Sequence, residues 1–264
     1  MIKKYFAVLL LFLLPIYGVA LPKTDPVPGG IVMIPIHSAA KTAPKVTFQK
    51  HRVMVLKSKQ GWLALVGIPL TEKTGKHKIY VNSAKVDFTI HHKDYPVQRI
   101  QLKSNKLVTP DKKMQQQMIK ESRYMQKLFN TWTSNIPDTQ LQLPVHGRYS
   151  GLFGMHRVFN GEPWGYHKGL DIAVKRGTPV HAAANGVVLA TGKFLLTGNT
   201  VFVNHGQGLV TVYCHMEAIN VHRGEHVTQK TVLGFAGMTG RATGPHVHFG
   251  VSMNGARVNP LLFA

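Results

Sequence analysis

The stretch T-G-R-A-T-G-P-H-V-H-F-G at residues 239–250 marks the start of a β-strand in the C-terminal half of the chain. Glycine and proline end one segment there, and an alternating run of residues follows. Because successive side chains of a strand point to opposite faces, His246 and His248 lie on one face and their apolar neighbours on the other. Two imidazoles on one face of a strand suit a metal site, so we expect further ligands elsewhere in the chain.

An earlier segment, H-K-G-L-D at residues 167–171, supplies two more residues of metal-ligand type. His167 and Asp171 are four residues apart, which is an even step in extended backbone, so both face one side of a strand. A helix would also bring them to one side. The glycine at position 169 and the Ile-Ala-Val run after Asp171 favour the strand.

Residues 209–215 form a third alternating run. The alternation predicts that Thr211, Tyr213 and His215 share a polar face, and that Cys214 faces the core. Cys214 is therefore expected to be a packed thiol rather than a zinc ligand. As the single cysteine of the chain, it forms no internal disulfide.

The polar faces of these runs together provide a candidate catalytic zinc site. Zinc binds nitrogen and oxygen ligands tetrahedrally, and catalytic sites use three protein ligands and a water. His167, Asp171 and one histidine of the 246/248 pair would complete such a set. The residues themselves leave open which of His246 and His248 is the ligand. The other one, with His215, remains for proton transfer and charge stabilisation.

The composition is strongly basic, with 32 Lys and Arg against 11 Asp and Glu and a formal net charge of +21. Such a charge favours polyanionic partners, namely nucleic acid, anionic membrane or an acidic cell-wall polymer. Residues 21–145 carry 20 basic and 7 acidic side chains, a net +13, and residues 146–264 carry 10 and 4, a net +6. We therefore expect the N-terminal half to dock on anionic envelope polymers, unless the charge serves only solubility.

Residues 1–20 have the features of a secretory signal peptide. Lys3 and Lys4 precede an apolar run over residues 6–16 that is short for a membrane span, and small residues follow up to Ala20. The alternative is an uncleaved N-terminal anchor, which also places the domains outside the cytoplasm. We expect an exported protein, in the periplasm, cell envelope or extracellular space, with no transmembrane segment after cleavage. Export argues against nucleic acid as the partner.

The chain, at 264 residues, has room for two domains, and its patterns predict a mainly β fold. Short strand-like runs with frequent turn signals predict a small β-sandwich or barrel-like domain over residues 21–108. Residues 109–143 predict a bridging helix and linker, with Thr109 as N-cap and Pro110 in the first turn. Residues 144–264, which are rich in glycine and in brief strands, predict an antiparallel β-sheet domain with a groove.

These motifs resemble the LytM/lysostaphin-type zinc endopeptidases of bacterial cell walls. The ordered set H-x-x-x-D, Tyr-x-His and G-P-H-x-H-F lies within residues 147–260, and the region ahead of it is similar to the β-rich N-terminal domain of some members. The resemblance implies a zinc ion bound by His167, Asp171 and His248. It implies that His215 and His246 are catalytic, non-ligand histidines. Leucine usually stands at position 216, where this chain has methionine.

The resemblance also implies a function, a zinc metallopeptidase that hydrolyses peptide stems or cross-links of peptidoglycan. Zinc would activate water and polarise the scissile carbonyl, while His215 or His246 takes the proton. D-Ala–diaminopimelate cross-links are preferred over glycyl bridges as the bond cut, because the chain has no recognisable wall-targeting domain of the lysostaphin kind.

Two alternatives concern the role of the whole chain and of its N-terminal domain. Some relatives keep this fold without hydrolysis, bind the cell wall and activate amidases; those lack parts of the metal set, whereas this chain has all five residues. The N-terminal domain either docks the enzyme on the anionic wall or covers the catalytic groove. We favour a regulatory, partly occluding role.

Overall fold

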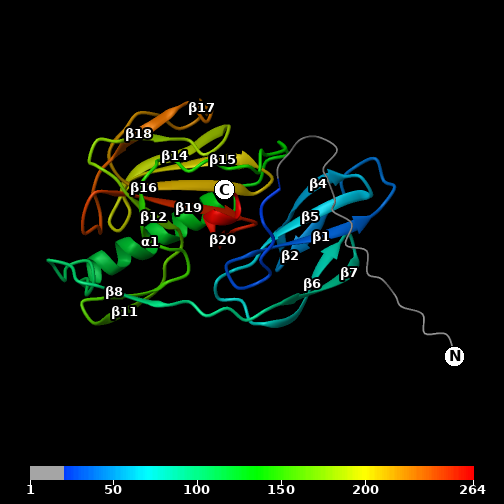
Figure 1. The fold of residues 1–264 in the computed structure, drawn as a ribbon, viewed down its shortest axis with the longest axis horizontal. Helices are drawn as coiled ribbons and strands as arrows, with labels where there is room; N and C mark the ends of the chain where they lie inside the picture. Colours follow the sequence, from blue (N-terminus) through cyan, green and yellow to red (C-terminus); the bar gives the residue numbers. More distant parts are fainter. Residues whose placement is uncertain (1–20) are drawn as a thin grey trace.

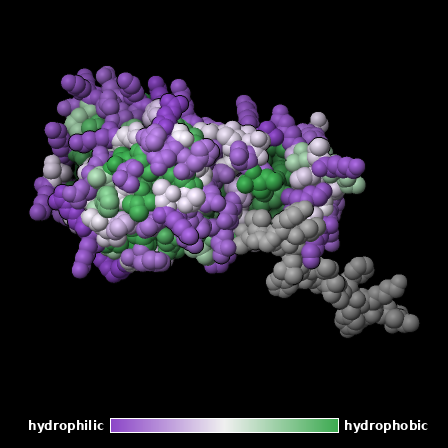
Figure 2. All heavy atoms as spheres, turned by 90° about the horizontal axis from the view of Figure 1, so that it is seen from above, coloured by the Kyte–Doolittle hydropathy of each residue, from purple (hydrophilic) through white to green (hydrophobic). Residues whose placement is uncertain are grey.

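The computed structural model describes residues 21–264, so the expected signal peptide lies outside the described residues (Figure 1). Two β-rich bodies lie side by side, and the helix α1 (Lys112–Phe129) packs on the C-terminal one. Figure 2 shows hydrophilic residues over most of the face seen from above, with smaller apolar areas between them. Within the described part of the chain, no helix is long and apolar enough to cross a bilayer.

The N-terminal body is a sandwich of two antiparallel sheets with strand orders β1-β5-β4 and β3-β2-β6-β7. Its strands are β1 (Ile31–His37), β2 (Val46–Phe48), β3 (His51–Arg52), β4 (Met54–Ser58), β5 (Gly61–Gly67), β6 (Gly75–Val81) and β7 (Ala84–Ile90). Val46, Ala64 and Ile79 are fully buried between the sheets. The predicted β-sandwich is confirmed.

Strand β5 connects the core of the sandwich to the core of the C-terminal body. Its residues alternate, so Trp62, Ala64 and Val66 face the sandwich core, while Leu63 and Leu65 join the apolar cluster of the C-terminal sheet. The Asn254 side chain adds hydrogen bonds to the backbone N and O of Gly67, at 2.7 and 3.0 Å. The two bodies therefore share buried apolar surface.

The C-terminal body contains a large antiparallel sheet with the main strand order β17-β14-β15-β16-β19-β12-β9. Its elements are β9 (Arg148–Gly151), β12 (Leu170–Ala173), β13 (Pro179–His181), β14 (Gly186–Phe194), β15 (Gly198–Gly206), β16 (Leu209–Ile219), β17 (His226–Val227), β18 (Val232–Ala236), β19 (His246–Met253), β20 (Ala256–Val258) and the short 3-10 helix η1 (Pro260–Leu262). The predicted antiparallel sheet is confirmed, and β19 begins at His246 as expected.

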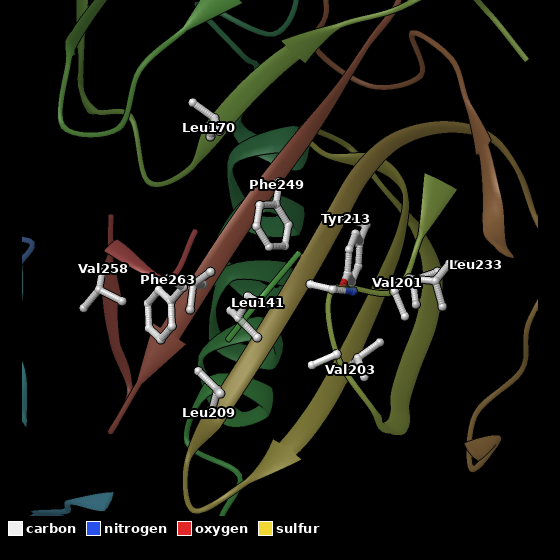
Figure 3. Packing of buried hydrophobic residues seen from close by; sticks show 14 of the residues in the cluster. Leu141, Leu170, Val201, Val203, Leu209, Tyr213, Leu233, Phe249, Val258 and Phe263 are labelled. Carbon is white, nitrogen blue, oxygen red and sulfur yellow. The ribbon is translucent and has the colours of Figure 1, made fainter. Parts of the chain in front are cut away.

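The two faces of this sheet are covered differently. Tyr213 and Phe249 project from one face into the main apolar core, and Figure 3 shows α1 on the far side of the strands. On that second face, Phe129 of α1 packs against Phe202 with ring centroids 5.4 Å apart. The helix is capped by Asp111, whose side chain accepts from Met114 N at 2.8 Å. The prediction that Thr109 is the N-cap is therefore wrong.

A fourth, small sheet joins the segment after the sandwich to the C-terminal body. β8 (Val97–Ile100) runs parallel to β10 (His156–Phe159), which forms a hairpin with β11 (Glu162–Tyr166). The hairpin turns at Asn160 and Gly161, whose φ angles of 51° and 88° suit a tight two-residue turn. This sheet was not predicted, and it borders the site described next.

Candidate active site

Strands β12 and β19 bring Asp171 and His248 together. The two residues are directly opposite in the antiparallel ladder, so their side chains lie on the same face of the sheet. His167 lies just before β12, which begins only at Leu170; the prediction of one strand through residues 167–171 is therefore wrong. The chain bends at Gly169, where a Cβ atom would lie 2.6 Å from Nε2 of His248, so only glycine lets that imidazole lie so close to the backbone.

Three potential ligand atoms converge at this point. Nε2 of His167 lies 3.0 Å from Oδ1 of Asp171 and 3.0 Å from Nδ1 of His248, and that Nδ1 lies 2.8 Å from the same carboxylate oxygen. His167 Nδ1 is 2.7 Å from the Leu152 carbonyl oxygen, to which it donates, so its Nε2 presents a lone pair. Converging lone pairs of two nitrogens and one oxygen fit a divalent cation.

The carboxylate of Asp171 is held from behind by Arg157 of β10. Nη2 of Arg157 donates to Oδ2 of Asp171 at 2.7 Å, which leaves Oδ1 to the two histidines. Gly151 permits this approach, since a Cβ there would lie 2.3 Å from Nη2. Burial acts to raise the pKa of Asp171, but the hydrogen bonds and charges of His167 and His248 hold that pKa well below its usual value. The group is therefore ionised at neutral pH.

Sequence reasoning did not find Arg157. The signal that could have found it is the Asn160-Gly161 pair between two strand-like runs, which is a strong hairpin signal. A hairpin predicted there would have placed Arg157 on a strand close to the H-x-x-x-D motif. Its contact with Asp171 is a long-range relationship that the local sequence does not contain.

His215 lies at the same site, but the backbone conformation that places it there differs from the one predicted. Thr211 and Tyr213 are fully buried on the core side of β16, so the prediction that they share a polar face with His215 is wrong. Cys214 faces the side of His248, its direct partner in the ladder. His215 has a positive φ of 63°, which breaks the alternation, and its ring centroid lies 6.1 Å from that of His248.

His215 and His246 lie side by side next to the three converging atoms. Their ring centroids are 4.6 Å apart, and Nε2 of His246 is 4.0 Å from Oδ1 of Asp171. Nδ1 of His215 is 2.7 Å from the Thr239 carbonyl oxygen, and Nδ1 of His246 is 2.9 Å from that of Gly244. Each Nδ1 therefore carries the proton, and each Nε2 is free to accept another.

Burial shifts the pKa values of several groups at this site. Burial, followed by the charges of His246 and His248, lowers the pKa of His215 to about 3. Burial also lowers the pKa of His248 to about 4. Cys214, which is buried, has its pKa raised by burial to about 12 and so stays a protonated thiol. The structure thus brings all five predicted site residues together, and the carboxylate among them is ionised.

Comparisons with known proteins agree on one family. Residues 165–260 match the profile of peptidase family M23, and residues 24–93 match the peptidase family M23 N-terminal domain. A crystal structure of a candidate M23 peptidase from Pseudomonas aeruginosa is 34% identical, with a TM-score of 0.76 over 91% of this chain and 95% of that chain.

Two curated relatives match less than half of this chain. The DD-carboxypeptidase/endopeptidase Mpg of Neisseria meningitidis is 41% identical over 122 residues, which is 46% of this chain. The peptidoglycan DD-endopeptidase ShyA of Vibrio cholerae is 39% identical over 95 residues, or 36% of this chain. The matched segments span 28% and 22% of those two proteins.

Proposed function

This chain belongs to peptidase family M23, and from that membership we propose that it is an exported, zinc-dependent peptidoglycan endopeptidase. One observation is the main support for the proposed activity. The ligand atoms of His167, Asp171 and His248 lie within 4.8 Å of one another, and two further imidazoles present free Nε2 atoms beside them. A set of ligands next to groups that can accept a proton is what metal-assisted hydrolysis requires.

The proposed zinc ligands are Nε2 of His167, Oδ1 of Asp171 and Nδ1 of His248. Three protein ligands leave a fourth tetrahedral position for water or substrate, as in catalytic zinc sites. When bound, zinc supplies Lewis acidity, which lowers the pKa of water to ~7 and polarises a carbonyl group. Arg157 and the Leu152 carbonyl oxygen orient two of the ligands, as outer-shell groups do in metal sites.

His215 and His246 provide the proton transfer. One of them would accept the proton of the attacking water at Nε2. The resulting imidazolium would form a hydrogen bond to the oxyanion and then transfer that proton to the leaving amine. Both cannot be charged at once without a large cost, because their rings are only 4.6 Å apart. The pair therefore carries one proton through the reaction.

The proposed bond is a D,D-peptide cross-link rather than a glycyl bridge. The names of the Neisseria and Vibrio relatives, which are a DD-carboxypeptidase/endopeptidase and a DD-endopeptidase, support this choice. The completeness of the five-residue set favours hydrolysis over the alternative, a wall-binding protein that activates amidases.

We further propose that the segment between the two bodies limits access to the site. His167 and His215 are only 7% exposed, and Asp171 only 6%. Strand β8 pairs with β10, the strand whose Arg157 contacts Asp171, and the Gln98 side chain donates to the Ser150 carbonyl oxygen at 3.1 Å. If β8 restricts entry, Gln98→Pro should loosen it and raise the rate of hydrolysis. An unchanged rate in a folded variant would contradict occlusion.

Digestion of purified sacculi tests the proposed activity. The chain from Leu21 to Ala264, loaded with zinc, should release soluble muropeptides, a chelator should stop the release, and added zinc should restore it. His246→Ala serves as the control that keeps the three ligands. Binding to sacculi without release by the wild-type protein would overturn the proposal in favour of the non-hydrolytic alternative.

A further inference from the structure

The outer face of α1 carries exposed apolar and cationic side chains that have no role in the proposed hydrolysis. The inner face of the helix packs Phe129 against Phe202, with Met125 beside them. On the outer face two large apolar side chains are exposed, Ile119 at 51% and Tyr124 at 44%. These two apolar side chains lie on a helix face that is otherwise polar and charged.

Cations surround these two apolar side chains. They are Lys112, Lys113, Lys120, Arg123 and Lys127, all exposed. None of the five forms an ion pair within residues 21–264. The acidic residue of the helix, Glu121, accepts from the backbone N of Leu195 at 2.9 Å and from the Gln117 side chain at 2.8 Å. The outer face is therefore cationic without internal compensation.

The surface is hollowed and extends onto the neighbouring sheet. Six side chains of α1 line a shallow hollow of about 490 Å³; they are Gln116, Ile119, Lys120, Arg123, Tyr124 and Lys127. The ring of Tyr124 stacks on Phe194 of β14, with centroids 6.2 Å apart and an interplanar angle of 29°. Exposed Lys193 adjoins Phe194 and adds a further cation.

We propose that this outer face of α1 docks on the anionic lipid headgroups of a membrane. Lys and Arg side chains attract anionic lipid, while Ile119 and the amphipathic ring of Tyr124 enter the boundary between headgroups and acyl chains. A soluble polyanion would need only the cations. The two exposed apolar side chains among them favour a lipid surface. The contact would hold the C-terminal body at the membrane, and it does not depend on the proposed peptidase activity.

Vesicle flotation tests this proposal with the chain from Leu21 to Ala264, which contains every described element. Vesicles of phosphatidylcholine with phosphatidylglycerol should bind the protein, pure phosphatidylcholine should not, and salt should weaken the binding. K120Q/R123Q/K127Q should lower the partition coefficient at least tenfold, since each cation near an anionic surface contributes about fivefold. The matched control K41Q/K45Q/K59Q removes the same charge from exposed sites of the sandwich and should change binding less than about twofold.

A second comparison separates a lipid surface from a soluble polyanion. I119S/Y124S should weaken vesicle binding while leaving binding to polyphosphate unchanged. Thermal melts should show that every variant is folded, because all the altered side chains are at least one-third exposed. I119S/Y124S should melt lower than the charge variants, because it loses the stacking of Tyr124 on Phe194. The proposal is overturned if the wild type does not float with anionic vesicles, or if both triple variants lose binding equally. It is also overturned if I119S/Y124S leaves vesicle binding unchanged.

Discussion

Cys214 and His248 lie directly opposite each other in the ladder between β16 and β19, so both face the same side of the sheet. Ordinary alternation would send the next residue, His215, to the opposite side with Tyr213. Its positive φ of 63° returns the imidazole to the side of His248. The proposed catalytic pair of His215 and His246 therefore depends on a single left-handed residue in β16.

The first prediction concerns that backbone conformation. A positive φ is strained for alanine and free of strain for glycine, so His215→Gly should be more stable than His215→Ala by about 1 kcal/mol. Urea unfolding of the two variants in metal-free buffer measures the difference. Equal stability, or a more stable alanine variant, would show that residue 215 does not hold this conformation in solution.

The second prediction separates the roles of the two histidines of β19. His246→Ala should keep zinc and lose activity by about 10²–10⁴-fold, because it removes a proton-transfer group. His248→Ala should lose both zinc and activity, because it removes a ligand. The zinc content of the purified variants, measured by atomic emission, shows which of the two histidines is a ligand. Zinc lost from His246→Ala and retained by His248→Ala would reverse the assignment.

The third prediction tests the close approach of His248 to Gly169. A Cβ at residue 169 would lie 2.6 Å from both Cε1 and Nε2 of the imidazole, so Gly169→Ala should displace the ring and weaken zinc binding at least tenfold. Gly244→Ala is the matched control, since a Cβ there meets nothing within 4 Å. Competition with a zinc-binding dye measures both affinities. An equal loss in the control would contradict the assigned contact.

The fourth prediction concerns His205, which is buried between the Asn185 carbonyl oxygen and the Thr211 hydroxyl at 2.8 Å each. Burial lowers the pKa of His205 from 6.5 to about 4. Between these pH values the unfolded chain binds more protons than the folded chain, so stability falls as pH drops through this window and is unaffected above it. The loss is about 3 kcal/mol, from ~1.4 kcal/mol for each unit.

His205→Asn supplies the control for this pH dependence. The amide can still donate to the Asn185 carbonyl oxygen, but it does not titrate. Its unfolding free energy in metal-free buffer should therefore fall less than that of the wild type between pH 6.5 and 4. Identical slopes for the two proteins would rule out His205 as the source.

Much of the fold and of the candidate site follows from local sequence patterns. The alternation after Pro245 predicts β19 and the shared face of His246 and His248, because side-chain direction in a strand depends only on position. The short runs before residue 91 predict the strands of the sandwich for the same reason, whereas the run at β8 joins a different sheet. Where neighbouring residues alone determine the local structure, the sequence is sufficient to predict it.

The predictions from sequence fail where contacts between residues distant in the chain determine the structure. Thr109 has the residue type of an N-cap, but its hydroxyl donates to the Asn105 carbonyl oxygen at 3.4 Å, and Asp111 caps the helix instead. The positive φ of His215 was not predicted, because an alternating run of residues indicates ordinary extended backbone at that position. Arg157 matters only because β10 lies beside Asp171, which is a property of the tertiary fold.

The most direct test of the proposed activity is digestion of a purified muropeptide dimer joined by a D-Ala–diaminopimelate cross-link, followed by mass spectrometry. The zinc-loaded chain from Leu21 to Ala264 should convert the dimer into its two monomers, with the mass of one water added across the cross-link. Chelation should stop the conversion, and His246→Ala should show almost none. An intact dimer after prolonged incubation with zinc-loaded protein, or monomers formed equally well with chelator present, would contradict the proposed zinc-dependent endopeptidase.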